Sequence, residues 1–547
     1  MTPPSGDKRR EPDPLGDPSG AEALAPQAPA IDDGSSRTRL SSGRLLARNT
    51  AVNIGGSVLT MGVAFAAIPI LIAGLGTDRF GVLALTWIVI GYSGLFDLGL
   101  GRALTKLTAE KIGAGEEDEI PPLFWTALAA MFALGVLAAS AVALLAPLLV
   151  GSILKIPDAL EGESLGAFYV LSVSIPVVIC SAGLRGSLEA RQRFELTNGV
   201  AVPMTALSYL GPIATLAFGA SLVYVVAAVV ASRVLAFCIY LTLNLRVDPA
   251  LRRVRGVRRR AVGPLLRYGG WVTVSNVVTP LLTSIDRFVI GAFISTTAVA
   301  YYATPYEAVS RLRIVSQNLS SVFFPAFALN LAHDHRRAVL FGRGSRFIFV
   351  TLFPLALVIV TFAYELLDIW VGTEFAQNSE RVMQWLTIGV LANSLAQLAY
   401  GFVQSARPDL HAKLSLAELP LFLGVFVVLV RGYGIEGAAL AWSGRVVIDA
   451  TILYGMVWWL SPSSAPGVRR IYWMAGSAIL ALIGVSLLEG IALKAGVFVV
   501  VATLYAVAVW RYVLEPDERT VLGDRLSQLA RAPARRRRRR AKAKVGP

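Results

Sequence analysis

Long apolar segments, each about the length needed to cross a bilayer, fill most of this chain of 547 residues. The hydrocarbon core of a membrane is about 30 Å thick, so a membrane-spanning helix needs roughly 20 apolar residues. Hydrophobic residues make up 55% of the sequence and charged residues only 16%, a balance outside the range of ordinary soluble domains. The sequence therefore predicts an all-α integral membrane protein.

Windows of this length predict about fourteen transmembrane helices. Basic residues gather in alternate loops, as in the run "RRVRGVRRR" at 252–260, whereas the opposite loops carry few. Because cytoplasmic loops are enriched in Lys and Arg, both termini are predicted to lie in the cytoplasm. The predicted segments are 50–74, 80–103, 122–150, 166–188, 198–219, 221–245, 268–293, 298–328, 346–367, 381–404, 413–430, 435–459, 471–488 and 491–512.

The two ends of the chain differ from the apolar middle. The first 43 residues are rich in Pro, Gly, Ala, Asp and Ser and are predicted to be disordered. The run "RRRRRR" at 535–540 is predicted to attract anionic membrane lipids, and no folded module for reading nucleic acid accompanies it. Two cysteines, Cys180 and Cys238, and three histidines predict neither a disulfide framework nor a metal site.

An internal repeat organises the middle of the chain. The sequence "AAVVASRVL" from Ala227 returns as "AALAWSGRVV" from Ala438, so that Arg233 and Arg445 correspond. At nearly the same offset, "GTDRFGVLAL" (76–85) corresponds to "STTAVAYYAT" (295–304). The shared offset predicts two six-helix halves that run in the same sense, related by an axis along the membrane normal. The predicted parts are a disordered segment at 1–43, six-helix bundles at 44–260 and 261–462, two further transmembrane helices at 463–513 and a basic cytoplasmic tail at 514–547.

Several arginines interrupt the apolar segments, where a charge costs about 2.5–3.5 kcal/mol at the centre of a helix. Such side chains are expected to face water or a partner instead of lipid. Arg233 and Arg313 have no acidic residue three or four positions away, so we expect them to contact a ligand in an internal cavity. Arg311 lies two residues from Arg313, a rotation of about 200° on a helix, so only one of the two is expected to face that cavity.

Other arginines have a carboxylate at a spacing that favours pairing within the protein. Residues four apart lie on the same side of a helix and can form an ion pair. For three arginines, structural pairing and ligand contact both remain open: Arg445 with Asp449, Arg311 with Glu307, and Arg185 with Glu189.

Three segments resemble a known family: "GLFDLGLGRALTKLTAE" (94–110), "LLTSIDRFVIG" (281–291) and "GYGIEGAALAWSGRVVID" (432–449). They are similar to the polysaccharide-exporter branch of the multidrug/oligosaccharidyl-lipid/polysaccharide exporter superfamily, which contains lipid-linked oligosaccharide flippases. The resemblance extends over roughly residues 44–460. It implies two bundles of six helices facing each other across a central cavity that opens alternately to each side. In the related lipid II flippases two extra C-terminal helices form a groove for a polyprenyl tail, and the last two predicted segments are candidates for this role.

The family implies the substrate, a polyprenyl-phosphate- or diphosphate-linked oligosaccharide. This lipid would be flipped from the cytoplasmic to the outer leaflet of the bacterial cytoplasmic (inner) membrane, by alternating access, for cell-surface polysaccharide biosynthesis. Guanidinium groups bind phosphate oxygens in a bidentate manner, so arginines are suited to hold its head. No enzymatic activity or cofactor is expected, and other polysaccharide-assembly proteins are further candidate partners. The predicted substrate contacts are Arg233, Arg313, Arg445, Arg185 and Arg102.

Acidic residues within the apolar segments are candidates for exchanging protons or sodium ions during transport. The alternative is ion pairing or placement at a helix end, since Asp97 precedes Arg102 by five residues and Asp286 stands beside Arg287. The candidate coupling residues are Asp97, Asp286, Glu307, Glu418 and Asp449.

Two other functions are compatible with a chain of this class. A drug/cation antiporter of the same superfamily would share the two six-helix halves, although arginines in the cavity would repel a cationic substrate. An integral-membrane polysaccharide polymerase or glycosyltransferase would be expected to carry a sizeable outer loop or a cytoplasmic acidic metal motif. The predicted outer loops here are short, and no convincing Asp-x-Asp motif is found.

Overall fold

The computed structural model describes residues 43–92, 97–253, 256, 285–331 and 333–513, which are helical apart from short connections. The chain divides into two units, Met1–Val52 and Asn53–Pro547. Of the first unit the structure describes only residues 43–52, which are helical. Apart from Gly43, the segment predicted to be disordered (1–43) lies outside the described residues, and so do the basic tail (514–547) and the predicted bundle boundary at 260.

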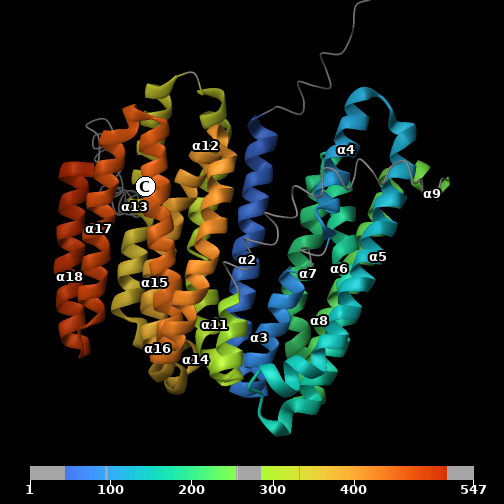
Figure 1. The fold of residues 1–547 in the computed structure, drawn as a ribbon, viewed down its shortest axis with the longest axis horizontal. Coiled ribbons are helices and arrows are strands. Elements are labelled where there is room, and N and C mark those ends of the chain that lie inside the picture. Colours follow the sequence, from blue (N-terminus) through green and yellow to red (C-terminus); the bar gives the residue numbers. More distant parts are fainter. Residues whose placement is uncertain (1–42, 93–96, 254–255, 257–284, 332, 514–547) are drawn as a thin grey trace, which may run out of the picture. The chain divides into compact units, whose positions relative to one another are not determined.

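Seven long helices occur among the described residues before residue 248, and we call this part the first half, after the division predicted from the sequence (Figure 1). Short 3₁₀ or π turns extend several of them, and a short helix, α9 (Ala250–Arg253), follows the last. In chain order the long helices are α2 (Gly43–Leu75), α3 (Thr77–Tyr92), α4 (Leu100–Ala114), α5 (Ile120–Leu148), α6 (Asp158–Ala190), α7 (Phe194–Thr215) and α8 (Leu222–Val247).

The second half begins, within the described residues, with a helix at 285–293. No strand occurs anywhere in the part of the chain that the structure describes. The helices that follow are α11 (Thr296–Ser310), α12 (Arg313–Leu329), α13 (Asp334–Thr361), α14 (Ala363–Val371), α15 (Thr373–Ala406), α16 (Pro408–Leu460), α17 (Ala465–Ser486) and α18 (Ile491–Ala508).

The prediction of an all-α membrane protein is confirmed. Among the described residues, nine helices are long and apolar enough to cross a membrane by length and composition. These nine helices do not confirm the predicted number of fourteen transmembrane helices, because several predicted segments are divided into two helices or joined into one. The segment predicted at 298–328 is two helices that break at Arg311 and Leu312. The segments predicted at 413–430 and 435–459 join in α16, whose backbone leaves the helical region at Gly434 (φ 60°, ψ −138°).

The segment predicted at 80–103 also needs correction, because α3 ends at Tyr92 and α4 begins only at Leu100. Between them Leu98 and Gly99 have positive φ angles of 49° and 73°, a conformation that interrupts a right-handed helix. The carboxylate of Asp97 accepts hydrogen bonds from the backbone N–H groups of Gly99 (2.7 Å) and Gly101 (3.2 Å). Asp97 therefore orders the start of α4.

The two halves contact each other through helices α3 and α11. These helices hold most of the repeat-related segments 76–85 and 295–304. Gly81 allows this close approach, since a Cβ atom there would lie 1.9 Å from the carbonyl oxygen of Thr296. At the turns predicted to face outward, Thr297 donates a hydrogen bond to Asp78. Lys155 donates from its ammonium group to the carbonyl of Phe293 at 2.7 Å.

The last two helices, α17 and α18, lie side by side and pack against α13 (Figure 1). The hydroxyl of Tyr505 donates a hydrogen bond to the carbonyl of Val350 at 2.9 Å. The ammonium group of Lys494, whose side chain is only 8% exposed, lies 3.1 Å from a carboxylate oxygen of Glu380. Apolar packing and a buried ion pair thus attach this helical pair to the second half.

Candidate functional site

A cavity of about 410 Å³ lies between helices α2 and α3 of the first half and the helix at 285–293, α11 and α12 of the second. This volume is in the range of ligand pockets, about 300–1,000 Å³. Its wall on the side of the second half carries three arginines, Arg287, Arg311 and Arg313, and one acid, Glu307. Excess positive charge therefore faces the first half across this cavity, which we call the chamber.

Arg311 and Arg313 both line the chamber, which corrects the prediction that only one of them would. The prediction assumed a continuous helix, but the chain turns at Arg311 and Leu312. There the backbone N–H of Ile314 donates to the carbonyl of Arg311, and that of Val315 to the carbonyl of Leu312, at 3.1 and 3.3 Å. These bonds to the third preceding residue form a tighter turn than an α-helix and change the angular spacing of the side chains.

Arg287 is the most deeply buried of the three, at 5% exposure. Its guanidinium lies 4.0 Å from the carboxylate of Asp286 and 4.2 Å above the ring of Tyr306. The hydroxyl of Tyr302 donates a 2.7 Å hydrogen bond to the other oxygen of Asp286. A charge buried this deeply needs compensation, and here a carboxylate and an aromatic face provide it. The arrangement fixes Arg287 in place before any ligand binds.

Arg311 and Arg313 differ in how their charges are compensated. Arg311 donates to Glu307 at 3.0 Å, the pairing expected from their spacing of four residues. Arg313 donates to the carbonyl of Ser310 at 3.3 Å and lies 5.8 Å from the centre of the Tyr306 ring. Within the described part of the chain, Arg313 has no carboxylate at ion-pair distance. Its positive charge therefore remains available in the chamber.

Arg233 approaches the same region from α8 of the first half. Its Nε atom is buried and has no hydrogen-bond partner among the described residues. The phenol of Tyr209 on α7 interacts with Arg311 and lies within electrostatic range of Arg233 and Glu307. The ring of Tyr209 also contacts that of Trp87, 5.2 Å away, and Trp87 lines the chamber. A buried donor without a partner is costly, so this guanidinium is well suited to an added acceptor.

Arg445, the repeat counterpart of Arg233, has different surroundings. Its guanidinium lies 3.5 Å from a carboxylate oxygen of Glu418 and 5.2 Å from the centre of the Phe422 ring. Asp449, the partner of Arg445 expected from their spacing of four residues, lies within electrostatic range of that guanidinium. Arg445 and Glu418 are 11% and 10% exposed, and Arg445 is not among the residues that line the chamber. Its predicted contact with substrate stays a prediction.

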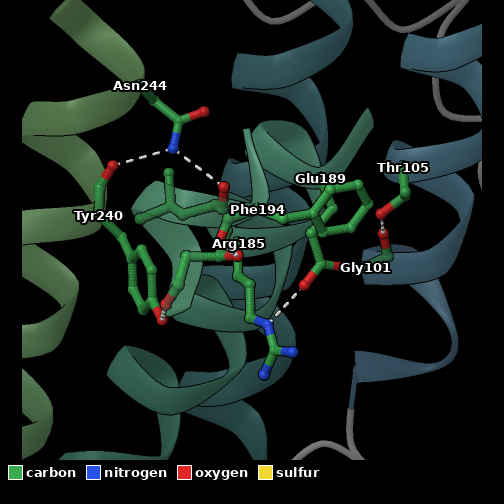
Figure 2. A network of polar contacts seen from close by, with 9 residues as sticks. Gly101, Thr105, Arg185, Glu189, Phe194, Tyr240 and Asn244 are labelled. Atoms are coloured by element: carbon green, nitrogen blue, oxygen red, sulfur yellow. Dashed lines mark hydrogen bonds and ion pairs between the residues drawn. The ribbon is translucent and has the colours of Figure 1, made fainter. Parts of the chain in front are cut away.

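Arg185 and Arg102 lie elsewhere in the first half. Arg185 donates to Glu189 at 2.7 Å, and its side chain is 53% exposed. Figure 2 shows this ion pair beside Asn244, whose amide donates at 2.9 Å to the carbonyl of Tyr240. Arg102 is exposed on α4. Arg185 is therefore paired within the protein, one of the two possibilities left open by the sequence. The substrate contacts predicted for Arg185 and Arg102 stay predictions.

The chamber thus contains Arg313 and Glu307 from the predicted set, with Arg233 next to its aromatic wall. Four side chains at or next to the chamber were not predicted from the sequence: Trp87, Tyr209, Arg287 and Tyr306. Arg287 stands in the segment "LLTSIDRFVIG", where a charged pair interrupts an apolar run, and this signal could have identified it. No comparable signal marks the aromatic residues.

The five acids predicted to couple transport to an ion gradient all have a polar or charged neighbour. Asp97 accepts two backbone hydrogen bonds, Asp286 accepts from Tyr302, and Glu307 accepts from Arg311. Glu418 has one oxygen 3.5 Å from Arg445 and the other without a partner among the described residues, and Asp449 lies within electrostatic range of Arg445. In the part of the chain that the structure describes, no group of three or more His, Cys, Asp or Glu residues could hold a metal ion. Coupling to protons or sodium ions stays a prediction.

Comparisons with known proteins agree with the all-α transporter fold. Residues 75–380 match the model of a family described as "Polysaccharide biosynthesis protein". A protein of Shigella flexneri named "Putative O-antigen transporter" is 25% identical over 74% of this chain and 96% of its own length. The solved lipid II flippase MurJ, in an inward closed conformation, has a TM-score of 0.64 at 12% identity and covers 86% of this chain and 100% of its own. An inward-facing multidrug resistance transporter of the MATE family, in the MOP superfamily, has a TM-score of 0.62 at 14% identity and covers 76% and 96%.

Proposed function

We propose a function from one premise: the chain belongs to the polysaccharide biosynthesis protein family whose model it matches over residues 75–380. Its role is to flip a polyprenyl-phosphate- or diphosphate-linked oligosaccharide from the cytoplasmic to the outer leaflet of a bacterial membrane. The name of the Shigella flexneri relative, an O-antigen transporter, supports this class of substrate. The proposed activity is transport and requires no chemical step.

The observation that carries the proposal is the charge of the chamber. Three arginines and one glutamate line it, and Arg233, whose Nε atom has no partner among the described residues, approaches from the other half. A phosphate or diphosphate offers several acceptor oxygens, and each guanidinium can bond two of them while it stays charged. The head of a lipid-linked sugar therefore supplies the acceptors that this wall lacks.

Transport requires that the chamber change the side to which it opens. In the proposed cycle the head enters from the cytoplasmic leaflet, and the polyprenyl chain stays in the bilayer. Contacts at the outer turns, such as those of Asp78 with Thr297 and of Lys155 with Phe293, must then break to release the head outside. The first of these contacts is part-buried and the second is exposed, and a single hydrogen bond contributes only about 0.5–1.5 kcal/mol, so breaking them costs little.

The charge of the chamber argues against the drug/cation antiporter alternative, because three arginines against one glutamate repel a cationic substrate. A cation antiporter would need the opposite balance. The polymerase or glycosyltransferase alternative has no support among the described residues, where no cluster of potential metal ligands occurs.

A translocation assay tests the proposal. The protein is reconstituted in liposomes with a fluorescent short-chain polyprenyl-diphosphate disaccharide, and flipping is followed by bleaching with a membrane-impermeant reductant. Arg233→Ala is expected to slow translocation at least about tenfold, as for the loss of a charged hydrogen bond. Arg233→Lys should retain part of the rate, because the charge remains and the bidentate geometry is lost.

The control is Arg193→Ala, which removes an arginine of similar size from an exposed ion pair with Glu195. This variant should translocate at the wild-type rate. Undiminished translocation by both Arg233 variants would exclude this residue from the mechanism.

A further inference from the structure

The wall of the chamber formed by the first half is apolar and aromatic. On α3 the lining residues recur every three or four positions, at Phe80, Ala84, Trp87, Ile88 and Gly91, so they share one face of the helix. None of these residues carries a charge to hold a phosphate. Another part of the substrate must therefore face this wall.

Among the described aromatic residues that line the chamber, only Trp87 combines partial exposure with a ring that no guanidinium of the described residues covers. Phe80 is 2% exposed, and its ring contacts that of Trp87 at 6.0 Å. Tyr306 is 6% exposed and has the guanidinium of Arg287 4.2 Å from its centre. Trp87 itself is half-buried and in contact with the rings of Phe80 and Tyr209, which restrict its movement.

The residues on either side of Trp87 along this face are small. Ala84 lies one turn before it and Gly91 one turn after it, and a Cβ atom at Gly91 would meet no other atom of the described residues within 4 Å. The indole thus stands between a methyl side chain and a residue that has no side chain. This shape suits a flat ring laid against the helix more than it suits a flexible chain.

We propose that Trp87 is a stacking platform for the sugar ring joined to the phosphate of the substrate. A pyranose ring carries hydroxyls at its rim and C–H groups on its faces. These C–H groups are slightly positive and are attracted to the negative face of an indole. The proposal rests on the proposed function, because it assumes that a lipid-linked sugar enters the chamber.

The position of Trp87 relative to the arginines agrees with this assignment. Its ring contacts that of Tyr209 at 5.2 Å, and the phenol of Tyr209 interacts with Arg311 and lies within range of Arg233. One aromatic side chain therefore separates the indole from two guanidinium groups. The first sugar of the substrate is bonded directly to the phosphate, so it lies beside the arginines when the phosphate binds them.

Two soluble probes test the platform: a short-chain prenyl diphosphate and the same compound carrying one N-acetylglucosamine. Binding is measured by titration calorimetry with the full-length protein in nanodiscs, for the wild type, Trp87→Leu and Trp87→Phe. The wild type should bind the sugar-bearing probe about threefold to tenfold more tightly than the sugar-free one, the range of an aromatic stacking contact. Trp87→Leu should remove this difference in affinity between the two probes, and Trp87→Phe should retain part of it.

Trp473→Leu is the control, because this tryptophan is 76% exposed and does not line the chamber. It should keep the wild-type preference for the sugar. If Trp87→Leu keeps that preference too, or if the wild type shows none, the platform is overturned while the proposed function stands. If the sugar-free probe does not bind the wild type at all, both the proposed recognition of phosphate by the chamber and the stacking platform are contradicted.

Discussion

Arg233 in the first half and Arg445 in the second occupy corresponding positions of the internal repeat, yet their surroundings differ. Arg445 lies 3.5 Å from the carboxylate of Glu418 and within range of Asp449. Both arginines have a buried Nε atom without a hydrogen-bond partner among the described residues, but Arg233 has no carboxylate of those residues at ion-pair distance and lies next to the aromatic pair of Tyr209 and Trp87. At this pair of positions the second half compensates the arginine with a carboxylate, whereas the first half leaves it available to whatever enters the chamber. The same sequence feature is structural in one half and available for binding in the other.

The largest effect is expected in the second half, at the buried pair of Asp286 and Arg287. Their side chains are 1% and 5% exposed. Removing one member of such a pair leaves an uncompensated buried charge, so Arg287→Ala should destabilise the fold by about 3–5 kcal/mol. The double variant Asp286→Asn with Arg287→Gln should recover much of this loss. Thermal unfolding in detergent measures both, and a stable Arg287→Ala protein would contradict the claim that the second half relies on internal pairing.

The two repeat-related arginines should respond differently to the same substitution. Arg445→Ala should lower stability by about 1–3 kcal/mol, because Glu418 is left without its partner. Adding Glu418→Gln should restore part of that stability. Arg233→Ala should unfold at or above the wild-type temperature, since it removes a buried charge that has no carboxylate partner among the described residues. Equal destabilisation by both alanine variants would remove the contrast between the halves.

A smaller effect is expected at Tyr209, whose phenol interacts with Arg311 across the two halves. Tyr209→Phe keeps the ring contact with Trp87 and removes only the hydroxyl. Loss of one such hydrogen bond is worth about 1 kcal/mol, so translocation should slow about threefold to tenfold. The liposome assay measures the rate, and an unchanged rate would mean that this hydroxyl has no part in positioning Arg233 or Arg311.

The smallest effect is expected at Arg185 and Glu189, the exposed ion pair on α6. Surface pairs four residues apart contribute about 0.3–0.5 kcal/mol, so Arg185→Ala should shift the unfolding temperature very little. Its translocation rate should stay close to that of the wild type. A large loss of transport with unchanged stability would instead extend the path of the substrate to this end of α6.

The sequence predicted the parts of the fold that depend on local composition. Apolar length identified the helices, and the repeat identified the correspondence of Arg233 with Arg445. Spacing also found the pair of Arg311 with Glu307. It missed the pairing of Arg445 with Glu418, because these residues lie on opposite sides of the backbone distortion at Gly434.

The shape of the chamber could not be predicted from the sequence either, because it also depends on a local distortion of the backbone. The turn at Arg311 and Leu312 carries no proline or glycine to mark it, and it decides that Arg311 and Arg313 face one space. Trp87 and Tyr209 are 122 residues apart, and only the packing of α3 against neighbouring helices brings their rings together.

The central claim is that arginines from both halves receive the same anionic head. The most direct measurement is the affinity of a short-chain prenyl diphosphate for the purified wild type, Arg233→Ala and Arg313→Ala, determined under identical salt conditions. We expect each substitution to weaken binding at least about tenfold, although the two residues belong to different halves. Binding that is unaffected by one or both substitutions would contradict it.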